Sequence, residues 1–384
     1  MQYSYDVIIA GTGSMGSAAC YYLAKRGCRV LGLEQFPQSP HDRGSHAGQS
    51  RIIRKAYFEH PDYVPLLLRS YYHLEQLENL SGEKLFYKTG LLYSGPPDHP
   101  VMMGVKKAAE EFRIELSQAA QHPAFRGAGT NETLIEPHAG FLVPEKTIEV
   151  LQQQARQYGA AIQTKEKIIG WKKEGGEITV TTSGNSYQAK KLVITAGAWA
   201  SQLVKGLNVP LNVTRQVLVW VQPEKPEMFL PENFPCWVIA ANDTAGVWYG
   251  FPYLAGNRFP GPAGLKFALH HAADTADPDT VDRATSDEEI RSICEAAGKY
   301  FIPAHCRVVA TKTCLYTNTP DEHFIIDHLP GYDKDVVIAC GFSGHGFKFV
   351  PVVGEILADL ALEGKTDLPA GFLRLSRFDQ GRLD

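Results

Sequence analysis

The sequence has few of the features that mark secreted, metal-binding or membrane proteins. Its seven cysteines are scattered, odd in number and without a C-x-x-C pair, which argues against a disulfide framework or a zinc site. No apolar run approaches the roughly 20 residues of a membrane span, and a strand expected at residues 6–10 leaves no room for a signal peptide. The net charge of −4 gives no basic excess for nucleic acid. We therefore expect a cytoplasmic protein without membrane, nucleic-acid or metal partners.

The N-terminus carries a glycine fingerprint. The apolar run at residues 6–10 leads into Gly11-Thr12-Gly13-Ser14-Met15-Gly16, a helix expected at residues 17–26, and a second strand that ends on Glu34. Glycines allow close approach to a pyrophosphate at the helix N-terminus, and an acid about 20 residues on binds ribose hydroxyls. This pattern predicts dinucleotide binding. Glu34 would repel a 2′-phosphate, but it does not distinguish NAD from FAD.

A second glycine-rich segment lies near the C-terminus. Gly341-Phe342-Ser343-Gly344-His345-Gly346-Phe347-Lys348 contains three glycines that let backbone approach a flat ligand, and it ends in a lysine that can supply a fixed positive charge. A lone cysteine, Cys314, precedes it. Together with the N-terminal fingerprint, this pair indicates a flavin held at both ends of the chain and one thiol free to tether it.

The remaining pattern is of alternating helical and β-rich regions. Helices are expected near residues 61–80, 103–112, 144–158 and 352–362, and a strand at residues 192–199 ends in a turn at Gly197 that offers a further backbone approach to the cofactor. In the β-rich part, a strand at residues 265–270 places Lys266, Ala268 and His270 on one face. Lys312, Cys314 and Tyr316 likewise share a face, and cationic neighbours would favour a Cys314 thiolate.

We expect an α/β (α+β) chain of two interleaved domains, since 384 residues can bury a sizeable core. A Rossmann-like FAD-binding domain is assigned to residues 1–83, 140–212 and 310–384. A β-rich substrate domain is assigned to residues 84–139 and 213–309.

Several motifs occur in the order of a known family. They are the glycine fingerprint, the run Gly44-Ser45-His46-Ala47-Gly48-Gln49-Ser50-Arg51-Ile52-Ile53-Arg54, Tyr249-Gly250-Phe251-Pro252, Gly264-Leu265-Lys266, Cys314-x-Tyr316, Asp321–Asp327, Gly341–Lys348 and Leu373–Phe378. Nearly end to end, the chain resembles the monomeric sarcosine oxidase and N-methyltryptophan oxidase family. The resemblance implies a flavoprotein amine oxidase whose FAD is attached through an 8α-S-cysteinyl bond, here at Cys314.

The same resemblance implies roles for individual side chains. Arg54 matches a bidentate carboxylate partner, with Lys348 as a second charge, and Arg51 is expected nearer the flavin. Lys266 matches an oxygen-activating cation, because a positive charge beside the flavin would stabilise charge developing on O₂. His270, Tyr249, Tyr316 and Gly344 are expected around the substrate. Further cofactor contacts are expected from Ser45, Ser50, Ile168, Gly197, Gly346 and Lys348.

Several of these residues also have a purely structural interpretation. Arg51 and Arg54 could belong to an exposed loop, Lys266 to a solvated strand edge, and Tyr249, Tyr316 and His270 to ordinary packing. Cys314 could be a small buried hydrophobe, and the ring of His345 could do no more than pack.

The sequence also departs from the family pattern. Paired histidines after Gly-Ser appear as His46-Ala47, and Ser50 replaces a threonine. The segment at residues 253–263 is longer than the usual connection, so we expect a different cavity roof. Cys236-Trp237-Val238 stands where the family lines its side-chain pocket.

The sequence therefore predicts a monomeric FAD oxidase of N-methyl or secondary amino acids, with O₂ as acceptor and sarcosine as the first expected substrate. N-methyltryptophan and L-pipecolate are the nearest alternatives. An NAD-dependent dehydrogenase, or a flavin-binding protein without activity, are more distant ones.

Overall fold

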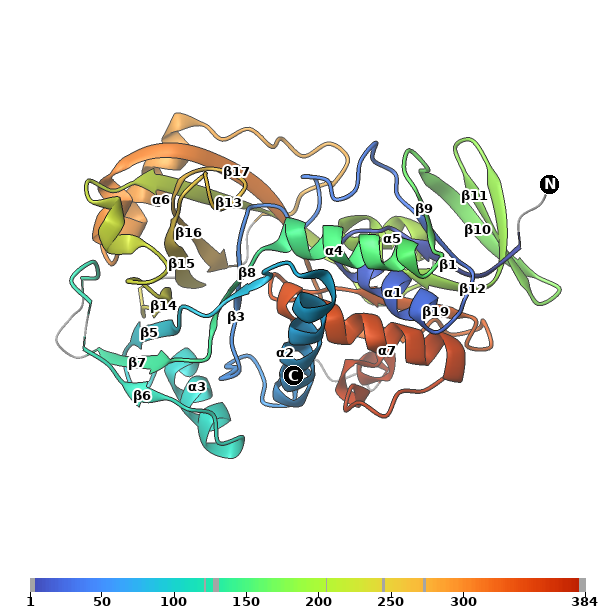
Figure 1. Cartoon of the computed structure of the whole chain (residues 1–384), viewed down its shortest axis with the longest axis horizontal. Helices are drawn as coiled ribbons and strands as arrows, with labels where there is room; N and C mark the ends of the chain where they lie inside the picture. Colours follow the sequence, from blue (N-terminus) through green and yellow to red (C-terminus); the bar gives the residue numbers. More distant parts are fainter. Residues whose placement is uncertain are drawn as a thin grey trace.

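The computed structural model describes residues 4–120, 122–126, 131–204, 206–243, 246–271 and 274–379. Two eight-stranded sheets stand at opposite ends of the molecule, with helices between and around them (Figure 1). Each sheet contains strands from distant parts of the sequence. The chain therefore passes several times between the two ends.

The first sheet holds the nucleotide fingerprint. Its central strand β1 (Ser4–Ala10) lies between two parallel neighbours, β12 (Ser186–Ile194) and β2 (Val30–Leu33). The other strands are β9 (Ala161–Gln163), β10 (Ile168–Glu174), β11 (Glu177–Thr182), β18 (Ile325–His328) and β19 (Val336–Cys340). Continuous burial along residues 7–10 of β1 and along β2 and β19 is what a parallel sheet covered on both faces requires.

Helices complete this half of the molecule. Apolar faces of three helices form one core with β1, while residues from α5 (Ala200–Leu203) pack on the opposite face of the sheet. The three helices are α1 (Ser14–Lys25), α4 (Pro144–Gln157) and α7 (Val350–Glu363). α1 begins three residues before the expected start because the turn at Gly13 already serves as its N-cap.

The second sheet is mainly antiparallel. Its strands in order are β17 (Arg307–Asn318), β13 (Asn212–Gln222), β16 (Gly264–His271), β15 (Gly246–Leu254), β14 (Cys236–Ala240), β5 (Leu91–Gly95), β7 (Glu132–Glu136) and β6 (Ser117–Gln118). Helices α3 (Pro100–Glu111) and α6 (Asp287–Gly298) flank it. The domain boundary predicted at residue 310 falls within β17, which pairs with β13 along most of its length. The two-domain division stays a prediction.

A small third sheet joins the two halves. It contains β3 (Arg51–Ile53), β8 (Gly140–Leu142) and β4 (Phe86–Tyr87), and α2 (Tyr63–Ser81) lies beside it. Because Arg51 opens β3 and Arg54 follows it, this connection carries both predicted arginines to the space between the large sheets.

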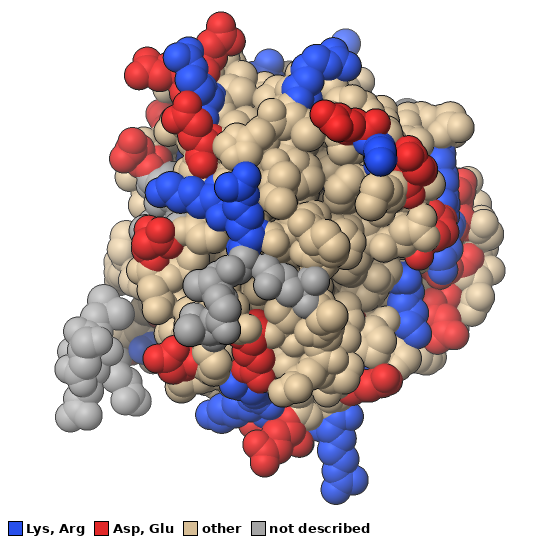
Figure 2. Space-filling view, turned by 90° about the vertical axis from the view of Figure 1, so that its left-hand side faces the viewer, with Lys and Arg blue, Asp and Glu red and all other residues tan. Residues whose placement is uncertain are grey.

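The described helices include none that is long and apolar enough to cross a membrane. On the face that looks out from the β-rich end, Lys and Arg side chains are interspersed with Asp and Glu around a mostly uncharged centre (Figure 2). That face therefore carries no broad field of one sign.

Candidate functional site

A large cavity extends from the glycine fingerprint to the second sheet. Most of the residues predicted to bind cofactor or substrate line it. These are Gly11, Gly13, Ser14, Met15, Glu34, Ser45, Arg51, Arg54, Ile168, Gly197, Tyr249, His270, Tyr316, Gly344, Gly346 and Lys348. Gly16, Ser50, Lys266 and Cys314 do not line it.

The nucleotide end of the cavity needs its glycines for close packing. Gly11 has φ +93°, and a Cβ there would lie 2.9 Å from the Thr195 carbonyl oxygen. A Cβ on Gly16 would lie 1.9 Å from the Gly11 oxygen, so Gly16 lets α1 pack against the turn. The Glu34 carboxylate accepts hydrogen bonds from the Thr12 and Phe36 amides, both at 3.2 Å. The acid is thus held at the end of β2, beside the first turn of α1.

The segment before β3 wraps around the Arg51 guanidinium. Arg51 donates to the carbonyl oxygens of Ser45, Ala47 and Ser50 at 2.7–2.8 Å. Gln49 has φ +71°, a conformation that residues other than glycine seldom adopt. It is fixed there because the Glu145 carboxylate accepts from the Gly48 and Gln49 amides at 3.0 and 3.2 Å. Within the described chain, the buried His46 Nε2 and Ser50 Oγ have no hydrogen-bond partner.

Lys266 supports this segment from behind. Its Nζ donates to the Gly48 and Ser50 carbonyl oxygens at 2.7 and 2.6 Å, and it lies 4.0 Å from the Phe251 ring centre. The side chain is 1% exposed, so the reading as a solvated strand edge is wrong. Burial, followed by the charge of Arg51, lowers the pKa of Lys266 well below the usual lysine value. Glu145, the two carbonyl acceptors and the aromatic face act in the opposite direction and favour its charged form.

The predicted carboxylate clamp already has an internal partner. Arg54 Nη2 lies 2.6 Å from both carboxylate oxygens of Glu59, and the guanidinium lies over the Tyr57 and Phe58 rings. Arg54 is 3% exposed, so it does not belong to an exposed loop. Burial raises the pKa of Glu59, but Arg54, His345 and Lys348 outweigh it and lower that pKa to about 2. A substrate carboxylate would therefore compete with a charged Glu59, which the sequence analysis missed.

Lys348 lies at the end of the glycine-rich segment, in the short helix Phe347–Phe349. Its Nζ donates to the His345 carbonyl at 2.8 Å and lies 5.2 Å from the Tyr57 ring centre. Burial, with a contribution from Arg54, lowers the pKa of Lys348 to about 7. The expectation of a fixed positive charge is therefore wrong: near neutral pH, the lysine is only partly protonated.

Aromatic side chains line the same cavity as Arg54 and Lys348. His270 Nδ1 lies 3.3 Å from the Tyr316 hydroxyl. The Tyr249 and Tyr316 hydroxyls are hydrogen-bonded to each other. A Cβ on Gly344 would lie 2.4 Å from the Tyr316 ring, so only glycine permits the segment to approach this wall. Burial raises the pKa of Tyr249 to about 12, which keeps its phenol neutral.

Cys314 lies one layer behind the wall. Its side chain packs in a small cluster with Leu218, Trp220, Ala268 and Tyr316, while the next two residues of β17, Leu315 and Tyr316, line the cavity. Arg51, Lys266, Arg283 and Lys312 each lower the pKa of Cys314, but burial outweighs them and the pKa is raised. The cationic neighbours therefore favour the thiolate, but they do not overcome the burial of the thiol in its packed position.

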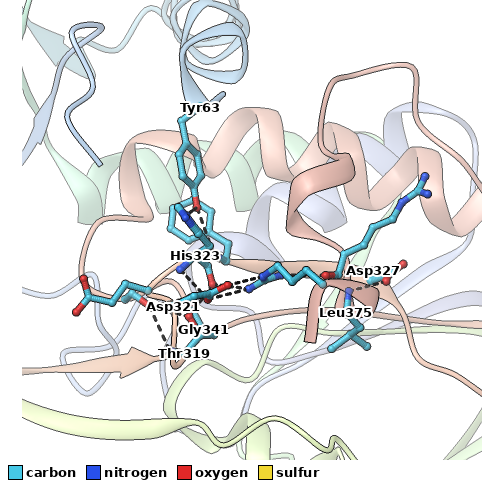
Figure 3. A network of polar contacts seen from close by, with 12 residues as sticks. Tyr63, Thr319, Asp321, His323, Asp327, Gly341 and Leu375 are labelled. Carbon is cyan, nitrogen blue, oxygen red and sulfur yellow. Dashed lines mark hydrogen bonds and ion pairs between the residues drawn. The ribbon is translucent and has the colours of Figure 1, made fainter. Parts of the chain in front are cut away.

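A polar network supports the glycine-rich segment from the C-terminal side (Figure 3). Asp321 pairs with Arg377 at 2.7 Å, and Asp327 accepts from the Leu375 amide at 2.9 Å. The Tyr63 hydroxyl lies 3.3 Å from His323 Nδ1 and accepts from the Phe324 amide. The Asp321–Asp327 motif thus joins α2 and the C-terminal segment to the loop that carries Lys348.

The long segment at residues 253–263 does not form a cavity roof, contrary to expectation. Phe259 packs against Tyr87 and Phe141, and the Gln49 amide donates to the Pro262 carbonyl at 3.1 Å. No described residue of this segment lines the cavity. Of Cys236, Trp237 and Val238, only Val238 lines it.

These residues and this fold identify the family. Residues 6–360 match the family described as FAD dependent oxidoreductase, DAO, and the chain belongs to it. It is 40% identical to monomeric sarcosine oxidase from Streptomyces avermitilis, covering 100% of this chain and 99% of that protein. It is 33% identical to N-methyl-L-tryptophan oxidase from Escherichia coli, covering 97% and 99%. The chain is therefore an FAD-dependent amine oxidase, which decides between FAD and NAD.

Solved structures show the same fold. The open form of NikD, an amino acid oxidase essential for nikkomycin biosynthesis, superposes with a TM-score of 0.84 at 23% identity over 97% of this chain and 98% of that chain. L-proline dehydrogenase from P. horikoshii gives 0.81 at 22% identity over 100% of both chains. The expected fold class is confirmed.

The donor set fits FAD. Gly13, Ser14 and Met15 at the N-terminus of α1 line the cavity, and a helix N-terminus suits a pyrophosphate. Gly13 has open space where a Cβ would stand. Farther along, Arg51, the unpartnered His46 Nε2 and Ser50 Oγ, and the close approach at Gly344 suit a polar, flat ring system.

Proposed function

We propose that this protein oxidises N-methyl or other secondary amino acids with O₂, and that sarcosine is its substrate. The balanced reaction is sarcosine + O₂ + H₂O to glycine, formaldehyde and H₂O₂. The observation that carries the proposal is that Arg54 and Lys348 line the same cavity as Tyr249, His270 and Tyr316. Cations suit a carboxylate, and an adjacent neutral aromatic wall suits an amine with a small substituent.

FAD, when bound, would accept one hydride equivalent, that is two electrons and a proton, from the carbon next to the amine nitrogen. Arg54 and Lys348 hold the substrate carboxylate, and Gly344 gives the substrate room beside Tyr316. The His270 ring and the Tyr316 hydroxyl orient the amine. Arg51 contributes positive charge at the boundary between the cofactor and substrate parts of the cavity. Lys266, which is buried behind Arg51, supplies positive charge for the reaction with O₂.

We further propose covalent attachment of FAD through an 8α-S-cysteinyl bond at Cys314. Cofactor contacts come from Gly11, Gly13, Ser14, Met15, Gly16, Glu34, Ser45, Ser50, Ile168, Gly197, Gly346 and Lys348. All seven cysteine thiols are free, which supports a reducing, cytoplasmic location. The name monomeric sarcosine oxidase of the relatives supports a monomer.

Peroxide release from a panel of amines tests the substrate. We expect sarcosine to give the highest kcat/KM, because Phe58, Val238 and Val247 also line the cavity and should limit the room for a large substrate side chain. The panel includes N-methyl-L-tryptophan and L-pipecolate, the alternatives, and glycine as a primary-amine control. A higher kcat/KM for either alternative would assign the protein to that substrate.

Arg54→Ala is expected to raise KM for a carboxylate substrate by about 10- to 150-fold. A hydrogen bond to a charged group contributes about 1.5–3 kcal/mol, and 1.4 kcal/mol corresponds to about tenfold in affinity. The measurement is steady-state peroxide release, together with the Kd of acetate as a simple carboxylate ligand.

Because Arg54→Ala leaves Glu59 buried without its partner, Arg54→Ala/Glu59→Gln serves as the folded control. Glu59→Gln alone should tighten acetate binding, since the competing charge is removed. If the double variant bound acetate as tightly as Glu59→Gln alone, Arg54 would be removed from the substrate site.

Carboxylate affinity should also fall as pH rises through about 7. The folded-state pKa of Lys348 is lowered to about 7, so the lysine is charged below that pH and loses its charge above it. The positive charges of Arg54 and Arg51 disfavour the protonated form of Lys348, while the carboxylate of Glu59 favours it. The Kd of acetate should rise by up to about tenfold per pH unit above pH 7, the limit for one linked proton. In Lys348→Met, this slope should flatten; a retained slope would assign it to another group.

A further inference from the structure

The segment at residues 274–284 crosses from the β-rich half to the nucleotide-binding half. It leaves the end of β16 and returns to α6, and it runs as an orange coil along the top of the molecule (Figure 1). Its two ends are tied to β13: the Ala276 amide donates to the Val213 carbonyl at 2.7 Å, and Arg215 Nη2 donates to the Ala284 carbonyl at 2.6 Å. We call residues 274–284 the strap.

One strap carboxylate binds two side chains of the cavity wall. Trp199 Nε1 donates to Asp279 Oδ1 at 2.8 Å, and Gln202 Nε2 donates to Asp279 Oδ2 at 2.9 Å. Trp199 and Gln202 both line the cavity. Each carboxylate oxygen therefore accepts from a different wall residue, an arrangement that no neutral side chain of similar size provides.

The strap is shaped to hold this carboxylate in place. The Asp279 amide donates to Asp277 Oδ1 at 2.8 Å, and the Val281 amide donates to the Asp277 carbonyl at 2.9 Å. These bonds form a turn with Asp279 inside it. The position of Asp279 thus follows from the strap's own backbone as well as from its two donors.

The strap also contacts the wall on the other side of Trp199. Val281 packs into the cluster of Trp199, Leu315 and Phe36, and Arg283 Nη2 donates to the Arg43 carbonyl at 3.2 Å. The Trp199 and Phe36 rings meet edge to face at 5.5 Å, and Phe36 also lines the cavity. The strap therefore connects Trp199 and Gln202 with the segment that carries Phe36 and Arg43.

We propose that Asp279 is a positioning residue for FAD, acting through Trp199 and Gln202 to hold the cavity wall closed around the bound cofactor. The strap lifts when FAD enters or leaves. The amine substrate plays no part in this role, which rests only on membership of the FAD-dependent family.

The test is the rate of FAD release. FAD-loaded Cys314→Ala and Cys314→Ala/Asp279→Ala are each diluted, and the rate of FAD release is followed as the recovery of flavin fluorescence. Loss of two charge-assisted hydrogen bonds should speed release by about tenfold or more. Because both proteins lack the thiol, the comparison holds whether or not FAD is covalently linked in the unmodified chain. No substrate is added, so the outcome is independent of the proposed amine oxidation.

Asp282→Ala is the matched control, because Asp282 lies on the same strap and its carboxylate accepts from the Ala284 amide of that strap at 2.9 Å. FAD release from Cys314→Ala/Asp282→Ala should stay within about twofold of FAD release from Cys314→Ala. Asp279→Asn, which keeps one acceptor, should give an intermediate rate and guards against a folding failure of the alanine variant. Combining Trp199→Phe with Asp279→Ala should change the free energy of activation for FAD release by less than the sum of the two single changes. Equal release rates for Asp279→Ala and Asp282→Ala, or full additivity with Trp199→Phe, would overturn the proposal.

Discussion

Lys266→Met should slow oxidation of the reduced protein by O₂ by about 100-fold or more, while reduction by substrate changes only modestly. The magnitude follows from the loss of one preorganised charge at a buried site, which typically costs about 10²–10³ in rate. Methionine keeps the length of the side chain and removes its charge. Lys266 is suited to this role because it is buried behind Arg51 and held by two carbonyl oxygens.

Stopped-flow absorbance can follow both steps on one preparation, with anaerobic reduction by sarcosine first and mixing with O₂ second. Lys106→Met is the control, since Lys106 lies on α3, is not part of the cavity lining and has Glu132 as its ion-pair partner at 2.8 Å. It should leave both rates unchanged. If Lys266→Met abolished reduction while reoxidation stayed fast, Lys266 would belong to the substrate side.

Cys314→Ala should fold and lose covalent FAD completely. Cys314 is the one thiol next to residues of β17 that line the cavity, and its conversion to alanine removes the only atom that could form the proposed bond. After denaturation, the variant's band on a gel should show no flavin fluorescence, whereas the unmodified protein's band should fluoresce.

Cys236→Ala is the control for this experiment. Cys236 is also fully buried and lies in the same sheet, but Thr89 Oγ1 donates to its sulfur at 3.5 Å and its position in β14 is remote from β17 in the strand order. Its band should keep full fluorescence. A fluorescent Cys314→Ala band would place the attachment elsewhere.

Much of the site could be predicted from the sequence because the signals were local. The glycine fingerprint predicted the turn before α1, and alternation along residues 265–270 predicted that Lys266, Ala268 and His270 share a face. In the structure, Ala268 packs in the cluster that contains Cys314 and Tyr316, and His270 reaches Tyr316. The roles assigned to these side chains stay predictions.

Other features had no local signal. Glu145 holds the Gly48 and Gln49 amides from 97 and 96 residues away, and neither spacing nor composition indicates that pair. Glu59 had a weak signal, an acid five residues after Arg54, that could have suggested an ion pair. The long segment at residues 253–263 was expected over the cavity, but Phe259 draws it towards Tyr87 and Phe141 instead.

The sequence by itself determined the fold class, the family and the backbone turns, because glycine placement and apolar periodicity act within a few residues. Only the tertiary structure decided the electrostatics of the site. Arg54 is neutralised by Glu59, the pKa of Lys348 falls to about 7, and burial raises that of Cys314 against four cations. The physical reason is that desolvation and Coulomb interactions depend on which groups exclude water from one another in space.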